Sequence, residues 1–302
     1  MDTKKPKIAL VVEGGAMRGI FATGVMDAFM EANFNPFNMY VGVSAGSTAL
    51  ASYVAGMYQR NYKIFTEYSI GEDFISWKKF FKGGHLVDLD WLWDITIRDM
   101  RLDLEKICAD QHEFYVGLTD VNTGKAVFVK PTPDNLEEFT KASSALPIMY
   151  RNQILMEGQA FVDGGLAAPI PVEEAYRRGA DYIMVIRSRP KSYTMESKAL
   201  NLWMSKVFLR KYPKVVEAYE ERANIYAKSI AFMRRPPSRI KIMEVNPPEA
   251  FKTQRLTKDL DLLNHDYELG KEAGRAAMKA FLEEAHELLN DQGNTSHNEP
   301  TA

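Results

Sequence analysis

Two short apolar runs near the N-terminus, each followed by a glycine-containing loop and a helical pattern, constrain this chain most. Residues 8–12 form a continuous run of apolar residues, and residues 38–43 form a second, mostly apolar run. Runs of this length are too short for helices and are typical of strands buried on both faces of a parallel sheet. Two successive strand, loop and helix units predict an α/β fold with right-handed crossovers. The loops that follow the strands then open at one edge of the sheet.

The second loop reads Gly-Val-Ser-Ala-Gly over residues 42–46 and leads into an alanine-rich helix predicted to reach residue 59. Gly-X-Ser-X-Gly between a strand and a helix is typical of a nucleophile elbow, in which a strained turn exposes the serine. Gly42 and Gly46 leave room for the neighbouring chain and helix to approach. A glycine-containing turn with an incidental serine gives the same five residues. Ser44 is therefore a candidate nucleophile that other motifs must support.

The first loop, Glu-Gly-Gly-Ala-Met-Arg-Gly over residues 13–19, precedes a helix predicted to close near residues 33–36. Backbone N–H groups at a helix N-terminus suit an anion, either a phosphate or the oxyanion of acyl transfer. The glycine spacing matches neither the dinucleotide motif Gly-X-Gly-X-X-Gly nor the P-loop motif, so both nucleotide sites are disfavoured. Arg18 either fixes this loop or attracts a phosphate-bearing substrate.

Composition and charge limit the class of protein. The chain has 302 residues, 46% of them hydrophobic, and its 38 basic and 40 acidic residues give a net charge of −2, which does not support nucleic-acid binding. Cys108 is the only cysteine, so an internal disulfide and a multi-cysteine metal site are excluded. Neither a secretion signal nor an apolar segment of bilayer length is present, and residues 1–7 are interpreted as a solvated leader. We therefore expect a cytoplasmic protein without metal or cofactor.

The middle of the chain continues the α/β pattern. Residues 113–120 and 125–130 alternate around an Asn/Gly turn and predict a hairpin, in which Asp120 is interpreted as a turn cap. A helix is expected over 136–145, and its Ser143 and Ser144 are interpreted as structural because neither lies in an elbow. A strand pair then ends at residue 162. Further elements are a helix over 172–178 and a strand over 181–187.

Asp-Gly-Gly follows the strand pair at residues 163–165. An aspartate at a strand end, with glycines beside it, can direct its carboxylate over the sheet edge. A tight turn capped by aspartate is the structural alternative for Asp163.

The segment of residues 60–112 mixes aromatic with basic residues. Such a mixture fits a helical cap packed on the domain, the wall of an acyl pocket, or peripheral contact with a membrane surface. Residues 195–289 are mostly helical, with a helical pattern over 195–234, an edge strand at 239–245 and a closing helix over 266–289. Residues 290–302 are polar and predicted to be disordered. With no internal repeat and no clear linker, we predict one domain over 1–302.

Together, the motifs at residues 13–19, 42–46 and 163–165 resemble the patatin-like phospholipase family of bacterial type. The pattern of that family is an oxyanion loop Gly-Gly-Gly-X-Arg/Lys-Gly, a Gly-X-Ser-X-Gly elbow and an Asp-Gly-Gly/Ala motif, in this order. The resemblance covers about residues 7–187. It implies a three-layer α/β/α sandwich with a mostly parallel central sheet, a helical cap and C-terminal helices.

The resemblance also implies a serine lipid acyl hydrolase with an acyl-enzyme intermediate. Ser44 would be the nucleophile and Asp163 its base, without histidine, metal or cofactor, and the substrate would be a lipid or another acyl ester. The implied oxyanion donors are the N–H groups of Gly14, Gly15 and Ala16. The implied supporting positions are Arg18, Gly19, Gly42, Gly46, Gly164 and Gly165. Ala16 departs from the family pattern, because its methyl group restricts the backbone where the family has a third glycine.

Two alternatives stay open at this stage. A Ser-His-Asp esterase of α/β-hydrolase type would use His265 as its base, and a non-catalytic lipid-binding protein would keep only the pocket. The sequence does not choose among phospholipid, lysophospholipid, neutral lipid and simple ester, and it leaves the oligomeric state open.

Overall fold

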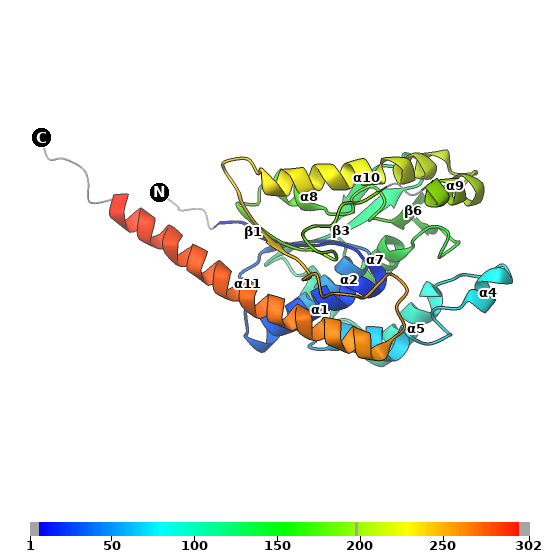
Figure 1. Ribbon diagram of the computed structural model, residues 1–302, viewed down its shortest axis with the longest axis horizontal. Coiled ribbons are helices and arrows are strands. Elements are labelled where there is room, and N and C mark those ends of the chain that lie inside the picture. The colour runs from blue at the N-terminus through cyan, green and yellow to red at the C-terminus, as the bar shows by residue number, and fades with distance from the viewer. Residues whose placement is uncertain (1–5, 197–198, 296–302) are drawn as a thin grey trace, which may run out of the picture.

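The computed structural model, which describes residues 6–196 and 199–295, has a central sheet between two layers of helices (Figure 1). Within the described residues the sheet has the strand order β5-β6-β3-β2-β1-β7-β8, and β4 also pairs with β3. The five strands from β3 to β8 in this order are parallel, whereas β4 and β6 run antiparallel to β3. The strands are β1 (Ile8–Val12), β2 (Met39–Val43), β3 (Glu113–Asp120), β4 (Ala126–Val129), β5 (Ile154–Met156), β6 (Gln159–Asp163), β7 (Tyr182–Ile186) and β8 (Lys241–Val245). The predicted α/β fold with a mostly parallel sheet is confirmed.

Alternate residues of the central strands pack into two different cores. In β1, Leu10 and Val12 join the core on one face of the sheet, whereas Ala9 and Val11 join the core on the other face. All four side chains are fully buried. This two-sided burial explains why the strand reads as a continuous apolar run in the sequence.

One face of the sheet is covered by four helices, which are α1 (Gly19–Glu31), α2 (Ala45–Ala55), α7 (Leu136–Ser144) and α11 (Leu260–Thr295). Helices α1 and α11 pack closely because glycines lie between them. A Cβ atom on Gly24 would meet the Tyr267 carbonyl oxygen, and one on Gly270 would meet the Phe21 carbonyl oxygen. Helices α8 (Val172–Arg177), α9 (Ala199–Phe208) and α10 (Pro213–Arg234) lie on the opposite side of the sheet (Figure 1).

Residues 60–112 form a set of short helices beside α2 and α7. They are α3 (Arg60–Lys63), the π-helix η2 (Ile64–Tyr68), α4 (Trp77–Phe81), α5 (Leu89–Met100) and α6 (Leu104–Cys108). The Trp93 indole N–H of α5 donates to the Glu137 carbonyl oxygen of α7 at 2.9 Å, which joins this segment to the core. Among the described residues, no helix is long and apolar enough to cross a membrane.

Several predicted boundaries differ from the structure. The helix predicted to reach residue 59 ends at Ala55, because Gly56 adopts a left-handed conformation (φ 72°) that terminates it. The helical pattern over 195–234 is divided into α9 and α10, and Pro213 begins the second helix, where its missing N–H costs no hydrogen bond.

The end of the chain also differs from its prediction. Helix α11 begins at Leu260 and continues to Thr295, so residues 290–295 are helical rather than disordered. The physical reason is that extending a helix already held by packing costs little per residue. The rest of the predicted tail, residues 296–302, and residues 1–5 of the predicted leader lie outside the described residues. The predicted edge strand is present as β8, which pairs with β7 at the end of the sheet.

Candidate active site

Ser44 lies at the sharp turn between β2 and α2 and has backbone angles of φ 54° and ψ −134°. Positive φ is strained for a residue with a side chain. The chain passes close to its neighbours here, because a Cβ on Gly46 would lie 2.5 Å from the Val12 carbonyl oxygen. A Cβ on Gly42 would lie 2.8 Å from the Ser47 Cα. The geometry is the strained turn that the sequence predicted for an elbow.

Asp163 is the last residue of β6 and lies opposite Leu118 of β3. The Ser44 hydroxyl donates a hydrogen bond to Asp163 Oδ2 at 2.7 Å, and the Gly165 N–H donates to Oδ1 at 2.7 Å. The turn requires Gly164 because a Cβ there would collide with the Gly117 carbonyl oxygen. Residues 44 and 163 are thus brought into direct contact across 119 positions of sequence.

The Asp163 side chain is buried, with 4% of its surface exposed. Burial raises the pKa of its carboxyl above the usual value, because loss of solvation disfavours the charged form. The hydrogen bond from Ser44 and the positive charges of Arg222 and Arg255 act in the opposite direction. A carboxylate with a raised pKa is a stronger base than an exposed one.

The first glycine loop lies against the elbow, since a Cβ on Gly14 would be 2.9 Å from the Ser44 Cβ. No hydrogen bond joins the N–H groups of Gly14, Gly15 or Ala16 to another described residue. Ala16 has φ 50°, so the alanine adopts a left-handed conformation where the resembled family has glycine. These backbone donors are available to an oxyanion beside Ser44.

Glu13 fixes the first loop to the end of β7. Its carboxylate accepts a hydrogen bond from the Ser188 N–H at 2.8 Å, and it lies 3.5 Å from the buried Arg187 guanidinium. The Ser188 hydroxyl in turn donates to the Gly14 carbonyl oxygen at 3.1 Å. The glycine loop is therefore held against the end of β7 by a buried ionic contact.

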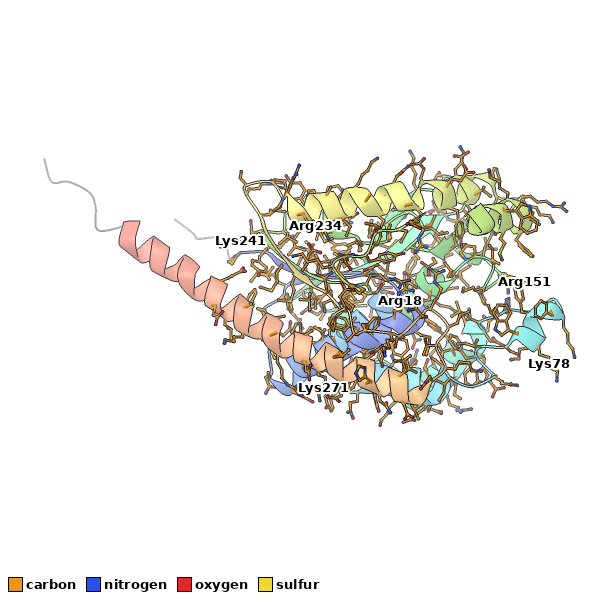
Figure 2. The ribbon with its side chains drawn as sticks, in the orientation of Figure 1. Arg18, Lys78, Arg151, Arg234, Lys241 and Lys271 are labelled. Atoms are coloured by element: carbon orange, nitrogen blue, oxygen red, sulfur yellow. The ribbon has the colours of Figure 1, made fainter. Side chains whose placement is uncertain are left out.

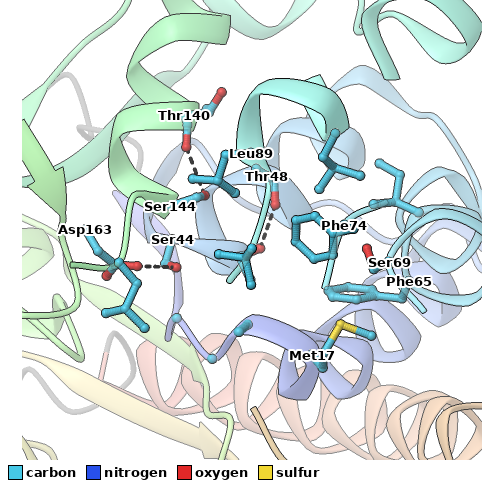
Figure 3. A pocket seen from close by; sticks show the side chains of 18 of the residues that line it. Met17, Ser44, Thr48, Phe65, Ser69, Phe74, Leu89, Thr140, Ser144 and Asp163 are labelled. Carbon is cyan, nitrogen blue, oxygen red and sulfur yellow. Dashed lines mark hydrogen bonds between the residues drawn. The ribbon is translucent and has the colours of Figure 1, made fainter. Parts of the chain in front are cut away.

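A cavity opens between this loop, the elbow and the helices of residues 60–112. Figure 3 shows Ser44 and Asp163 facing each other, with Phe65 and Phe74 across the cavity from them; Leu89 also lines the cavity. Predicted site residues that line this cavity are Gly14, Gly15, Ala16, Arg18, Ser44, Asp163 and Gly165. Of the remaining predicted positions, Gly42, Gly46 and Gly164 shape the two turns, and Gly19 lies where a Cβ would be 3.0 Å from the Phe65 ring.

The sequence-based reasoning missed three residues of the site. Ser143, interpreted as structural, accepts a hydrogen bond from the Ser44 N–H at 2.7 Å and donates to the Gly117 carbonyl oxygen at 2.6 Å. Arg222 of α10 and Arg255, in the loop before α11, line the cavity far from any of the three motifs. No local pattern marks these arginines, whereas the position of Ser143 in the segment that precedes the Asp163 strand pair was a usable signal.

The histidines whose side chains are described lie away from Ser44. His265, the base of the esterase alternative, is exposed and contacts Asp266 Oδ1 at 3.0 Å, and it does not line the cavity. His85 stacks on Tyr150, and His112 lies 2.8 Å from the Ile107 carbonyl oxygen. In the described part of the chain, no group of three or more histidine, cysteine and carboxylate residues could hold a metal ion.

Comparison with known proteins adds two family matches. Residues 10–176 match the family model described as "Patatin-like phospholipase", and residues 212–285 match the one described as "Domain of unknown function (DUF6363)". The chain is similar to "Uncharacterized protein YjjU" of Escherichia coli (strain K12), with 34% identity over 292 residues, 95% of this chain and 80% of that protein. Its fold is similar to the crystal structure of VipD from Legionella pneumophila, with a TM-score of 0.51 and 10% identity over 92% of this chain and 67% of VipD.

Proposed function

Because this chain belongs to the patatin-like phospholipase family of lipid hydrolases, we propose that it cleaves carboxylic esters of lipids through Ser44 and Asp163. The observation that carries the proposal is the 2.7 Å hydrogen bond from the Ser44 hydroxyl to the buried Asp163 carboxylate. A serine hydroxyl is a weak nucleophile until a base removes its proton as it attacks. Asp163 is the base that lies within reach.

In the proposed first step, Ser44 Oγ attacks the ester carbonyl carbon while its proton passes to Asp163. The carbonyl oxygen becomes an oxyanion, which the N–H groups of Gly14, Gly15 and Ala16 stabilise. The tetrahedral intermediate collapses when the bond to the leaving alcohol breaks. Asp163 gives its proton to that alcohol, which leaves an acyl group on Ser44.

In the proposed second step, water attacks the acyl carbon and Asp163 accepts the proton of that water. The bond to Ser44 Oγ then breaks, and the proton returns from Asp163 to Ser44. The products are a carboxylic acid and the free enzyme. Both steps use the same base and the same oxyanion donors, because each passes through a tetrahedral intermediate at the same carbon beside Ser44.

The cavity supports an acyl chain as the group that is transferred. The side chains across from Ser44 are mostly apolar, including Phe65, Phe74, Ile75, Leu89 and Leu92. Removing such surface from water on binding an acyl chain is favourable by about 25 cal/mol per Å². The helices of residues 60–112 therefore serve as the wall of the acyl site in this proposal.

Peripheral contact with a membrane is part of the proposal. On α4, Trp77 exposes 54% and Phe81 80% of their surface, next to exposed Lys78 and Lys79. On α9, Trp203 is 61% exposed. Figure 1 shows α4 and α9 at the same end of the molecule, and Lys78 and Arg151 lie at that end in Figure 2. Aromatic residues beside basic ones suit an anionic lipid surface, so we propose a cytoplasmic protein that docks on membranes through this end.

The proposed chemistry is tested with Ser44→Ala and Asp163→Asn in a p-nitrophenyl acyl ester assay. Each change is expected to lower kcat/KM by about a thousandfold or more, because either one removes the nucleophile or its base. Asp120→Asn is the control, since Asp120 is also buried but only caps a turn by accepting from the Thr123 N–H at 2.7 Å. Circular dichroism establishes that each variant is folded.

The results separate the alternatives. Full activity of Asp163→Asn, together with loss of activity in His265→Ala, would replace the proposed pair by a Ser-His-Asp mechanism. Failure of folded wild-type protein to react with a fluorophosphonate probe at Ser44 would favour a non-catalytic lipid-binding protein.

A further inference from the structure

Besides Arg60, whose guanidinium donates to the Met100 carbonyl oxygen and the Ser52 hydroxyl, three arginine side chains line the cavity. They come from distant parts of the chain, Arg18 from the 3₁₀ turn η1 (Ala16–Arg18), Arg222 from α10 and Arg255 from the loop before α11. Arg222 Nε donates to the Gly165 carbonyl oxygen at 2.7 Å, which places this guanidinium next to the Asp163 turn. The Met17 N–H, next to Arg18, donates to the Arg255 carbonyl oxygen at 3.4 Å. The cluster therefore adjoins both halves of the proposed catalytic site.

These arginines have few partners within the protein. Arg18 is 5% exposed, and its Nε atom has no hydrogen-bond partner among the described residues. No described carboxylate lies within 4.0 Å of the charged nitrogens of Arg18, Arg222 or Arg255. A buried guanidinium without a partner is costly, since arginine presents five donors and stays charged. The cavity thus holds donors that the protein itself does not satisfy.

The local charge is unbalanced as well. Burial, followed by the charges of Arg189 and Arg255, lowers the pKa of Arg18 to about 9. The pKa of Arg255 is also lowered, first by burial and then by Arg222. Glu13 acts on the pKa of Arg18 and Asp163 on that of Arg255 in the opposite direction, but neither carboxylate forms an ion pair with them, and Asp163 already accepts hydrogen bonds from Ser44 and Gly165. An anion between the guanidiniums would remove this mutual repulsion.

Resting on the proposed function, we infer that Arg18, Arg222 and Arg255 bind the phosphate of a phosphate-bearing acyl ester while its acyl chain occupies the apolar part of the cavity. Arginine suits this task because its planar fork binds phosphate oxygens through paired hydrogen bonds. Arg222 adjoins the Asp163 turn and Arg255 adjoins the glycine loop, whereas apolar residues of 60–112 line another part of the cavity, so an ester bond between an acyl chain and a phosphate-bearing alcohol would be placed near the serine.

This arrangement gives a role to the C-terminal segment. Arg222 and Arg255 both lie in residues 212–285, which match a domain of unknown function, and outside residues 10–176, which match the patatin-like family. The Ser44, Asp163 and oxyanion positions all lie within residues 10–176. The C-terminal segment therefore supplies two of the three phosphate-binding arginines of a site whose chemistry is carried by the N-terminal part.

The test compares two soluble esters with the same acyl chains, dihexanoylphosphatidic acid and dihexanoylglycerol, both below the concentration at which they aggregate. Arg255→Gln is the main variant, because its guanidinium donates no hydrogen bond to a described residue, so the substitution leaves no protein partner unsatisfied. We expect kcat/KM for the phosphate-bearing ester to fall about tenfold or more, mainly through KM, and that for the neutral ester to fall less than about threefold. Arg255→Lys should recover part of the loss. Arg235→Gln, which removes an exposed charge just beyond α10, is the matched control.

Competition by inorganic phosphate distinguishes a site for the phosphate of a lipid from a site for free phosphate. We expect phosphate to compete with dihexanoylphosphatidic acid and to compete less well in Arg255→Gln. Arg255-dependent inhibition by phosphate, without any wild-type preference for the phosphate-bearing ester, would show a site for free phosphate and overturn the inference. Equal losses on both esters in Arg255→Gln would also overturn it. If wild-type protein hydrolyses neither ester, the proposed function itself is wrong. If it hydrolyses both esters equally well, only the phosphate-binding role of the arginines is wrong.

Discussion

The Ser143 hydroxyl accepts a hydrogen bond from the Ser44 N–H at 2.7 Å. Ser143 is fully buried, and its own O–H donates a hydrogen bond to the Gly117 carbonyl oxygen of β3. The hydroxyl thus ties the strained turn at Ser44 to the neighbouring strand. Backbone strain at a functional residue persists only when surrounding contacts hold it, and Ser143 provides one such contact.

Replacing Ser143 by alanine is expected to destabilise the protein and slow the reaction. The Ser44 N–H would be buried without a partner, which costs about 1–3 kcal/mol, and the turn would be free to relax. Urea unfolding measures the first effect, and kcat on a soluble ester the second. Ser144→Ala is the matched control for stability, because the Ser144 hydroxyl donates only to the Thr140 carbonyl oxygen of its own helix. Equal stability of the two variants would contradict the role given to Ser143.

The acid limb of the pH–rate profile should lie at a higher pH than the ordinary pKa of an aspartate side chain. Burial raises the pKa of Asp163, and only the ionised carboxylate accepts the Ser44 proton, so activity falls as pH decreases through that pKa. Arg222 and Arg255 oppose the shift. Arg255→Gln should therefore move the limb to higher pH, measured with a neutral ester, whereas Arg235→Gln should leave it in place. A limb that does not respond to Arg255 would indicate a different titrating base.

Ala16→Gly is expected to stabilise the protein by about 0.5–1 kcal/mol, because Ala16 is held at φ 50° and glycine adopts that conformation without steric cost. The change in the free energy of unfolding is measured by urea denaturation. The control is Ala231→Gly, at an exposed position of α10, which should destabilise by about 0.5–1 kcal/mol. Destabilisation of similar size in both variants would show that Ala16 is not strained.

Removing the exposed aromatic residues of α4 should weaken binding to lipid vesicles. Trp77 and Phe81 stack on each other with ring centroids 6.0 Å apart and together present a large apolar surface. Burial of such side chains contributes about 2 kcal/mol each, so Trp77→Ser/Phe81→Ser should lower vesicle affinity by about a hundredfold or more. Sedimentation with anionic phospholipid vesicles measures this.

Leu282→Ser provides the comparison for this prediction. Leu282 is 59% exposed on α11, which extends away from α4 in Figure 1. If Trp77→Ser/Phe81→Ser and Leu282→Ser reduce vesicle binding equally, or if neither reduces it, α4 is excluded as the docking element.

Local patterns accounted for most of the fold. The strands β1 and β2, the helices that follow them and the hairpin of β3 and β4 lie close to their predicted positions, because apolar runs and glycine turns are read over a few residues. The ends of α2 and α11 were less predictable, since a left-handed glycine ended one helix early and the other continued past its predicted end.

The aromatic residues of 60–112 show where sequence reasoning stops. Phe65 and Phe74 line the cavity, whereas Trp77 and Phe81 face solvent, although all four lie in one aromatic-rich segment. Short helices carry too few turns for a periodic pattern to mark an inner and an outer face. The packing of the segment against α2 and α7 decides the orientation.

The sequence by itself determined the strand and loop units and the three motifs that carry Ser44, Asp163 and the glycine loop. Only the tertiary structure brought Ser143, Arg222 and Arg255 to the same site. The physical reason is the separation along the chain over which each feature is specified. A strained turn is specified by its own glycines, whereas a guanidinium reaches a cavity only after a distant helix has packed against the sheet.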